Sequence, residues 1–115
     1  MRHGFVKVAA ATPDIRVADV VYNKEQICRL IEETASEEAK IVAFPELALT
    51  GYTCGDLFTQ DVLLGEVRRA ICEGAAATKE KDALIFVGMP LAVEGELYNV
   101  AAALCRGKIL GLVPK

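Results

Sequence analysis

The segment that decides the fold is IVAFPELALTGY, residues 41–52. It begins with a run of apolar residues, Ile41 to Phe44, which ends at Pro45. A continuous apolar run of this kind predicts a strand that is buried on both faces, as in parallel sheets. Glu46 then follows at the carboxyl end of this strand, where open α/β sheets bind their ligands. The rest of the chain decides whether other polar residues reach the same edge.

The composition is that of a single domain with a surplus of apolar residues. At 115 residues, the chain has room for one hydrophobic core. Its hydrophobic fraction of 53% and its mean hydropathy of +0.32 are high for a chain of this length. We therefore expect something outside the chain to cover part of its apolar surface.

The charge of the chain argues against two classes of partner. The formal net charge is -3, the pI is about 5.2, and the sequence contains no basic run. These features predict no binding to nucleic acid or to an anionic membrane surface.

No segment approaches the roughly 20 apolar residues of a membrane span, and the first residues lack the apolar core of a signal peptide. We therefore expect a cytoplasmic protein.

The four cysteines, Cys28, Cys54, Cys72 and Cys105, have no Cys-x-x-Cys spacing, and His3 is the only histidine. This pattern predicts no metal site. We interpret three of them as reduced thiols that act as small hydrophobic side chains. Cys54 is the exception, because it lies in the loop after Glu46 and is expected to be exposed.

The chain before and after residues 41–52 alternates between strands and helices. Phe5 to Ala11 is predicted to be a buried strand, which Thr12-Pro13-Asp14 ends. A helix follows, with Asn23 as its N-cap and Gln26 three residues later, as in a capping box. Its apolar face is expected to comprise Ile27, Leu30, Ile31, Thr34 and Ala35.

A second helix and a third strand follow the Glu46 segment. After a loop through Gly51 and Gly55, the helix is predicted to begin at about Asp61, and the strand to run from Leu84 to Met89, where a proline stops it. The apolar face of the helix is expected to comprise Val62, Val67, Ala70, Ile71 and Ala75. The order strand, helix, strand, helix, strand predicts parallel neighbours whose carboxyl ends share one edge.

The remainder of the chain is predicted to form two hairpins. Turns at Glu94-Gly95-Glu96 and Arg106-Gly107 separate a strand at Tyr98 to Cys105 from a last strand at Lys108 to Val113. Two reversals restore the original direction, so the last strand should end at the same edge as the first three.

That edge is therefore expected to bring together Glu46, Lys115 and Asn99. Each has a plainer interpretation alone: a solvated loop acid, a solvated terminal lysine and a turn or strand-edge hydrogen bonder. Together they predict a site, because an acid and an ammonium group hold each other ionised in a partly dry cleft.

Two sequence motifs resemble those of the nitrilase, or carbon-nitrogen hydrolase, superfamily. Phe44-Pro45-Glu46-Leu47, followed by Thr50-Gly51-Tyr52, resembles the glutamate motif of that family. Tyr98-Asn99 and the segment GKILGLVPK, residues 107–115, match the place where the family carries its lysine. Within the family, residues 4–10 and Gly55-Asp56-Leu57-Phe58 resemble the glutaminase domain of glutamine-dependent NAD synthetases.

The resemblance implies a fold and an extent. The family fold is a four-layer α-β-β-α sandwich, so the expected class is α/β, with half of that sandwich formed by a mixed sheet with helices on one face. Residues 1–115 would be the incomplete N-terminal portion of a carbon-nitrogen hydrolase (glutaminase) domain. The full enzymes of this type hydrolyse glutamine and use the ammonia for ATP-dependent amidation of nicotinic acid adenine dinucleotide to NAD.

The resemblance also implies roles for individual residues. Glu46 would be the general base and Lys115 would stabilise the anionic tetrahedral intermediate, while Tyr52 and Asn99 would bind substrate. The family's nucleophilic cysteine lies beyond the lysine, at which this sequence ends. We therefore expect a fragment of the synthetase that is inactive alone, and we do not expect Cys54 to replace the nucleophile, because the family has none in that loop.

The same resemblance sets the expected ligands and partners. Glutamine would be the substrate of the full domain and the full enzyme would be a homo-oligomer. No cofactor is expected in these residues, and ATP and Mg would serve the synthetase domain. Two alternatives stay open: another amidase or nitrilase of the superfamily, and a non-catalytic interaction module that binds a partner through an exposed sheet edge and apolar face.

Overall fold

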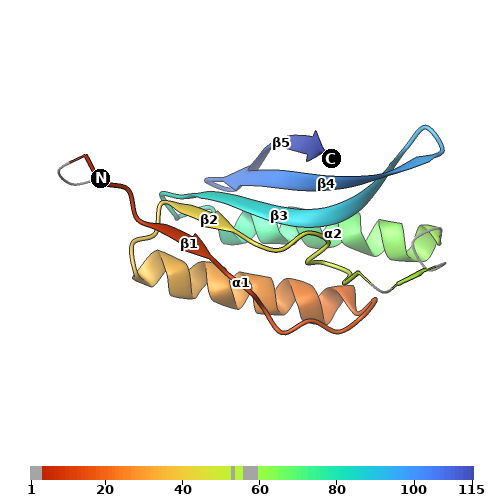
Figure 1. Cartoon of the computed structure of the whole chain (residues 1–115), viewed down its shortest axis with the longest axis horizontal. Coiled ribbons are helices and arrows are strands. Elements are labelled where there is room, and N and C mark those ends of the chain that lie inside the picture. Colours follow the sequence, from red (N-terminus) through yellow and green to blue (C-terminus); the bar gives the residue numbers. More distant parts are fainter. Residues whose placement is uncertain (1–3, 53, 56–59) are drawn as a thin grey trace.

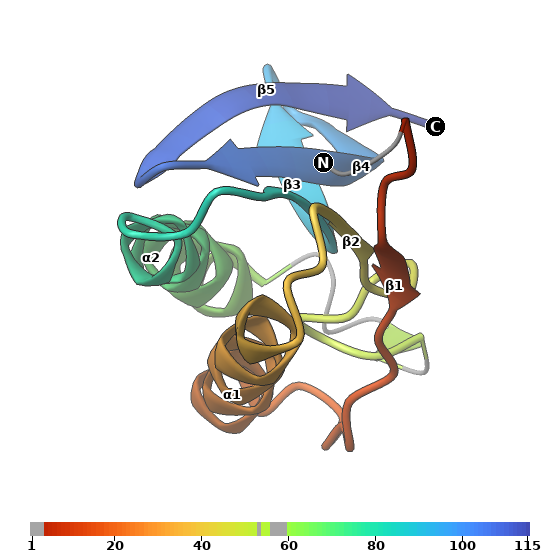
Figure 2. The same cartoon turned by 90° about the vertical axis from the view of Figure 1, so that its left-hand side faces the viewer.

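A computed structural model describes residues 4–52, 54–55 and 60–115 of the chain. In this part of the chain, a five-stranded sheet carries two helices on one face (Figures 1 and 2). The elements are β1 (Val8–Ala10), α1 (Val20–Ser36), β2 (Ile41–Ala43), α2 (Asp61–Ala77), β3 (Leu84–Val93), β4 (Glu96–Cys105) and β5 (Lys108–Pro114).

The sheet is mixed, as predicted. The strand order is β1-β2-β3-β4-β5, with parallel pairing from β1 to β3 and antiparallel pairing of β3 with β4 and of β4 with β5. The last strand therefore runs in the same direction as the first three. The expected α/β class with helices on one face is confirmed.

The hydrophobic core lies between the two helices and the sheet (Figure 2). Buried side chains on the helices and the facing strands include Ile27, Ile31, Val67, Val42, Ile85, Val87 and Leu104. Neither helix of the described part of the chain is long and apolar enough to cross a membrane.

Helix α1 begins earlier than the sequence predicted. Its N-cap is Asp19, whose Oδ1 accepts a hydrogen bond of 3.2 Å from the backbone N–H of Tyr22. The expected N-cap, Asn23, is wrong: Asn23 lies inside the helix and is fully buried. Asp19 and Asn23 are both of residue types that commonly cap a helix, so either could mark the start of α1 in the sequence. In the structure, the side chain of Asn23 points to partners in the core and does not cap the helix.

Helix α2 begins at Asp61 as predicted, but its first apolar residue faces solvent. The side chain of Val62 is 72% exposed, which corrects its assignment to the apolar face. The neighbouring Leu63 and Leu64 are buried and occupy the core positions of the first turn.

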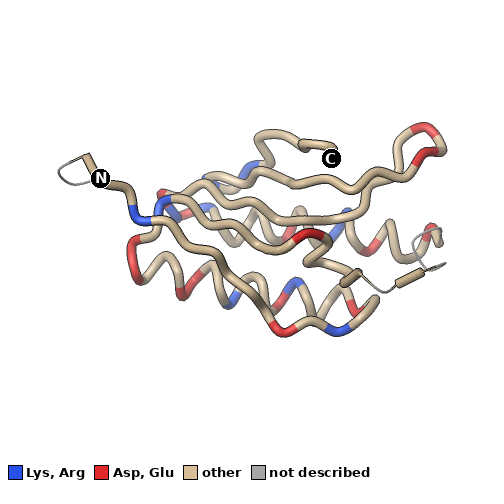
Figure 3. The backbone as a smooth tube through the Cα atoms, viewed as in Figure 1, with Lys and Arg blue, Asp and Glu red and all other residues tan. Residues whose placement is uncertain are grey.

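Strand β2 is buried on one face only, and β1 has no fully buried residue, although their apolar runs predicted burial on both faces. Val42 of β2 is 1% exposed, whereas Ile41 is 39% exposed and its partner in register, Val8, is 64% exposed. The physical reason is that both helices cover the same face of the sheet. In Figure 3, charged residues follow the helices, while the strands carry few. The face opposite the helices, here called the open face, is thus largely uncharged.

Strand β3 continues through Pro90 to Val93, which corrects the prediction that the proline stops it. β2 pairs with β3 only from Leu84 to Phe86, and beyond that point β3 pairs with β4. A residue without an N–H is tolerated where a strand has a partner on one side only. The extra length lets Pro90 pair with Asn99, which places Asn99 at the rim of the sheet.

The two predicted hairpins are present. The turns between β3 and β4 and between β4 and β5 each place two residues at positive φ: Glu94 and Gly95, and Arg106 and Gly107. This is the geometry of two-residue hairpin loops. β4 begins at Glu96, two residues before the predicted start at Tyr98.

Candidate active site

Glu46 lies in a short loop that leaves β2 and passes over β3. The Phe44 N–H donates to the Phe86 carbonyl at 2.9 Å, so the chain stays attached to β3 beyond the end of β2. Leu47 then adopts a positive φ of 52°, and the Gly51 N–H donates a hydrogen bond of 2.7 Å to the Leu47 carbonyl, which closes the turn. The turn holds the Glu46 carboxylate at the carboxyl ends of the parallel strands.

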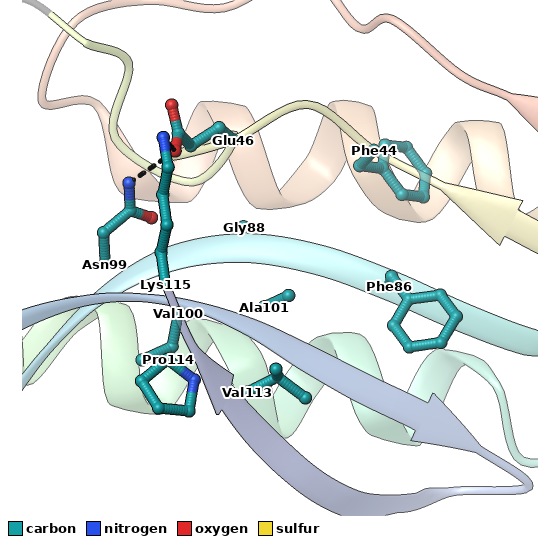
Figure 4. Close-up of a pocket in the computed structure, with 10 residues that line it drawn as sticks. All are labelled: Phe44, Glu46, Phe86, Gly88, Asn99, Val100, Ala101, Val113, Pro114 and Lys115. Atoms are coloured by element: carbon teal, nitrogen blue, oxygen red, sulfur yellow. Dashed lines mark hydrogen bonds and ion pairs between the residues drawn. The ribbon is translucent and has the colours of Figure 1, made fainter.

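Two donors meet on one oxygen of this carboxylate (Figure 4). Lys115 Nζ lies 2.6 Å from Glu46 Oε1, and Asn99 Nδ2 donates to the same oxygen at 2.7 Å. The Lys115 N–H also donates to the Asn99 carbonyl at 2.9 Å, which continues the pairing of β5 with β4. The predicted convergence of these three residues on one rim is confirmed.

The contacts of the ion pair shift the pKa of both partners. Hydrogen bonds from Lys115, and then from Asn99, hold the pKa of Glu46 below its ordinary value. The hydrogen bond to Glu46 and its negative charge raise the pKa of Lys115. The Glu46 side chain is 31% exposed and that of Lys115 is 73% exposed. Both groups are therefore ionised at neutral pH, and solvent screens the pair in part.

The ion pair stands at one end of a cavity with mainly apolar walls (Figure 4). The cavity has a volume of about 350 Å³, within the range of pockets for small molecules. Its lining residues are Phe44, Glu46, Phe86, Gly88, Asn99, Val100, Ala101, Val113, Pro114 and Lys115. A few convergent polar groups at the end of an apolar pocket can orient and polarise a small polar ligand.

Tyr52, predicted to bind substrate, is 61% exposed at the end of the same loop. Its hydroxyl is a further cause of the lowered pKa of Glu46. Tyr52 therefore belongs to the surroundings of the carboxylate. Three residues of the motif that follows, Asp56, Leu57 and Phe58, lie outside the described residues.

The cysteines correct two expectations. Cys54 is buried, not exposed, and its Sγ donates to the Thr50 carbonyl of its own loop at 3.2 Å. Cys72, expected to be a small core side chain, is exposed. Cys28 is half-buried, and burial raises the pKa of its thiol. Within the described part of the chain, no group of three His, Cys, Asp or Glu residues is arranged to hold a metal ion. His3 lies outside that part.

Gly88 is a residue of the site that the sequence reasoning missed. It lies in the interior of β3, directly beneath the backbone around Glu46. The signal was present, because an isolated glycine within a strand indicates a bulge or a close approach of another backbone.

Residues 7–114 match the carbon-nitrogen hydrolase family. A glutamine-dependent NAD(+) synthetase from Aquifex aeolicus is 38% identical over 96% of this chain, and the chain spans 19% of that relative's length.

Solved structures agree with this match. A glutamine-dependent NAD(+) synthetase from Cytophaga hutchinsonii superimposes with a TM-score of 0.89 at 28% identity, covering 96% of this chain and 19% of that one. An amidase from Nesterenkonia sp. superimposes with a TM-score of 0.78 at 17% identity, covering 100% of this chain and 44% of that one, which shows a shared fold.

Proposed function

The chain belongs to the carbon-nitrogen hydrolase family, and from this premise we propose that it forms the N-terminal portion of the glutaminase domain of a glutamine-dependent NAD synthetase. The domain would hydrolyse glutamine to glutamate and ammonia. The observation that carries the proposal is the meeting of Glu46, Lys115 and Asn99 at the end of the cavity. The relatives of this description, which match nearly the whole chain, support the choice of substrate.

Glu46 would act as the general base. Lys115 and Asn99 both bind Oε1, and neither occupies Oε2. A proton taken from a thiol nucleophile would go to the Glu46 carboxylate, and Glu46 would later return it to the departing ammonia. Its pKa lies below the ordinary value, so the carboxylate is ionised at neutral pH, which is the state that a general base needs.

Lys115 would stabilise the negative charge that forms on the amide oxygen. As the thiolate attacks the carbonyl carbon, the C=O bond becomes a C–O⁻ bond, and a positive group beside it lowers the energy of this intermediate. Before the reaction begins, the raised pKa of Lys115 keeps its side chain in the ammonium form.

The nucleophile would come from outside these 115 residues. Cys54 is buried and hydrogen-bonded within its own loop, which argues against its attack on a substrate in the cavity. We therefore propose that the chain alone does not hydrolyse glutamine. Ammonia release by the chain alone that is abolished by Cys54→Ala would contradict this point.

The remaining parts of the proposal concern the whole protein. ATP and Mg²⁺ would serve the amidation of nicotinic acid adenine dinucleotide in a separate domain. The full enzyme would be a cytoplasmic homo-oligomer.

The test is an assay of the full reading frame that encodes this chain. Ammonia release from glutamine is expected to fall by about 10²–10⁴-fold for Glu46→Gln and by about 10²–10³-fold for Lys115→Met. The matched controls are Glu33→Gln, on the exposed side of α1, and Lys108→Met, at the opposite end of β5; both should retain activity. Full activity in Glu46→Gln would overturn the proposal. Ammonia release without ATP-dependent formation of NAD would instead indicate another amidase of the family.

A further inference from the structure

The backbone that carries Glu46 lies directly on Gly88 of β3. A Cβ atom on Gly88 would lie 2.5 Å from the Leu47 nitrogen, 2.6 Å from the Pro45 carbonyl oxygen and 2.9 Å from the Glu46 carbonyl carbon. All three atoms belong to the backbone, so no side-chain rotation can relieve the overlap. Any residue other than glycine would push the loop away from the sheet.

The conformation of Gly88 itself does not require glycine. It is not among the glycines with positive φ, and it pairs in regular register with Ala101 of β4. An alanine at this position would fit the strand backbone. Glycine is therefore needed here for the space it leaves above the strand, which the Glu46 loop occupies.

A second residue holds the same loop from its other side. The fully buried Asn23 of α1 donates from Nδ2 to the Leu49 carbonyl at 3.0 Å and to the Arg16 carbonyl at 2.8 Å. Its Oδ1 accepts from the Arg16 N–H at 2.8 Å. Every hydrogen-bonding group of this side chain thus connects α1 either to the loop that carries Glu46 or to the segment that precedes α1. The Leu49 N–H also donates to the Gly88 carbonyl at 3.3 Å, so both attachments act on Leu49.

We propose that Gly88 and Asn23 are positioning residues that fix the Glu46 carboxylate within reach of Lys115 and Asn99. Gly88 sets how closely the loop approaches β3, and Asn23 sets where the loop ends against α1. The catalytic meaning of this placement rests on the proposed function, but the placement itself can be measured without any reaction.

The test is the pKa of Glu46, followed by NMR through the carboxyl carbon in the 115-residue chain. In Gly88→Ala, the loop should carry the Glu46 carboxylate away from its two hydrogen-bond donors, Lys115 and Asn99. The pKa of Glu46 should therefore rise toward its ordinary value. The matched control is Gly111→Ala, a second strand glycine, whose added Cβ has no atom within 4 Å. This control should leave the pKa of Glu46 unchanged. A loss of stability that leaves Gly88→Ala folded would not by itself move this pKa, so the fold of the variant is checked at each pH.

In the full reading frame, Gly88→Ala should lower kcat by about 10²-fold, the usual cost of misplacing a catalytic group by about 1 Å. A folded Gly88→Ala protein in which the pKa of Glu46 is unchanged would overturn the proposal. If the pKa rises but no variant affects ammonia release, the positioning stands and the proposed function fails.

Asn23→Ser tests the same inference without adding an atom, should Gly88→Ala fail to fold. The shorter side chain loses its bond to the Leu49 carbonyl, and the pKa of Glu46 should again rise. A folded Asn23→Ser protein with an unchanged pKa at Glu46 would exclude Asn23 as a positioning residue.

Discussion

Lys115 and Glu46 form an ion pair of 2.6 Å although they follow strands that are not neighbours in the sheet. Glu46 follows β2 and Lys115 follows β5, and β3 and β4 lie between these strands. The contact exists because the loop after β2 passes over β3 at Gly88. The pair is thus a product of loop placement as much as of strand direction.

The first prediction concerns the pH dependence of this pair. Lys115→Met removes the main cause of the lowered pKa of Glu46, so this pKa should rise, and it should rise less in Asn99→Ala, which removes the second cause. Because the pKa of Glu46 is lower in the folded state than in the unfolded state, its ionised form stabilises the fold at pH values above the unfolded-state pKa. This contribution is lost as the pH falls through the folded-state pKa. For Lys115, with a raised pKa, the contribution is lost as the pH rises through the folded value.

The stability difference between wild type and Lys115→Met should therefore be constant at neutral pH and vanish in acid. Urea unfolding between neutral and acidic pH measures it. Because both side chains are partly exposed, added salt should reduce the difference. A difference that grows in acid would contradict the assignment.

The second prediction concerns Thr78, which ends α2. Its buried hydroxyl donates to the Ala75 carbonyl at 2.6 Å and accepts from the Gly107 N–H at 2.9 Å, at the turn that begins β5. Thr78→Val leaves the Gly107 N–H without this partner and should lower the free energy of unfolding by about 1–3 kcal/mol. Thr34→Val is the control, because the buried Thr34 hydroxyl donates only to carbonyls of its own helix. It should cost less than about 1 kcal/mol. Equal losses in urea unfolding would contradict the special role of Thr78.

The third prediction separates two apolar residues of α2. Ile71 is 5% exposed and packs in the core, whereas Val62 is 72% exposed. Ile71→Ala should lower the free energy of unfolding by about 2–5 kcal/mol through the loss of buried contacts. Val62→Ala should change it by no more than about 0.5 kcal/mol. Thermal and urea unfolding of both variants will show whether the sequence-based placement of Val62 in the core is as wrong as the structure indicates.

The fourth prediction concerns the open face. Val8 and Ile41 are adjacent in register and expose apolar side chains there. Val8→Lys together with Ile41→Lys should reduce the binding of a hydrophobic dye and any concentration-dependent association, with little change in Tm. Val62→Lys, an exposed valine on the helical side, is the control and should leave both unchanged. Equal effects in the control would show that the open face is not a special surface, and would weaken the interaction-module alternative as well.

Strand direction was the part of the site that the sequence could predict. Counting reversals placed Glu46, Asn99 and Lys115 at one rim, because hairpin and crossover connections each fix the direction of the next strand. The contacts between them could not be predicted, since they depend on the extension of β3 past Pro90 and on the loop over Gly88.

The predictions for the burial of β1 and β2 and for the N-cap of α1 are wrong for the same reason: both depend on tertiary contacts that a residue pattern does not specify. Apolar runs at β1 and β2 predicted burial on both faces, but a pattern of residue types does not say what covers each face. The sequence pattern also predicts Asn23 as an N-cap, because capping and core hydrogen bonding use the same side-chain groups. Only the tertiary structure shows that Asp19 caps the helix and that Asn23 bonds to Arg16 and Leu49.

The bond between Lys115 and Glu46 joins residues that are 69 positions apart in the chain. Contacts of such large separation form late in folding, because a long loop must close before they can be made. Parallel pairing of β2 with β3 and both hairpins must be complete before the ammonium group reaches the carboxylate. A folding intermediate that lacks β5 has lost the Lys115 hydrogen bond, which is the largest cause of the lowered pKa of Glu46, so this pKa would be higher than in the native state and would report the docking of the last strand.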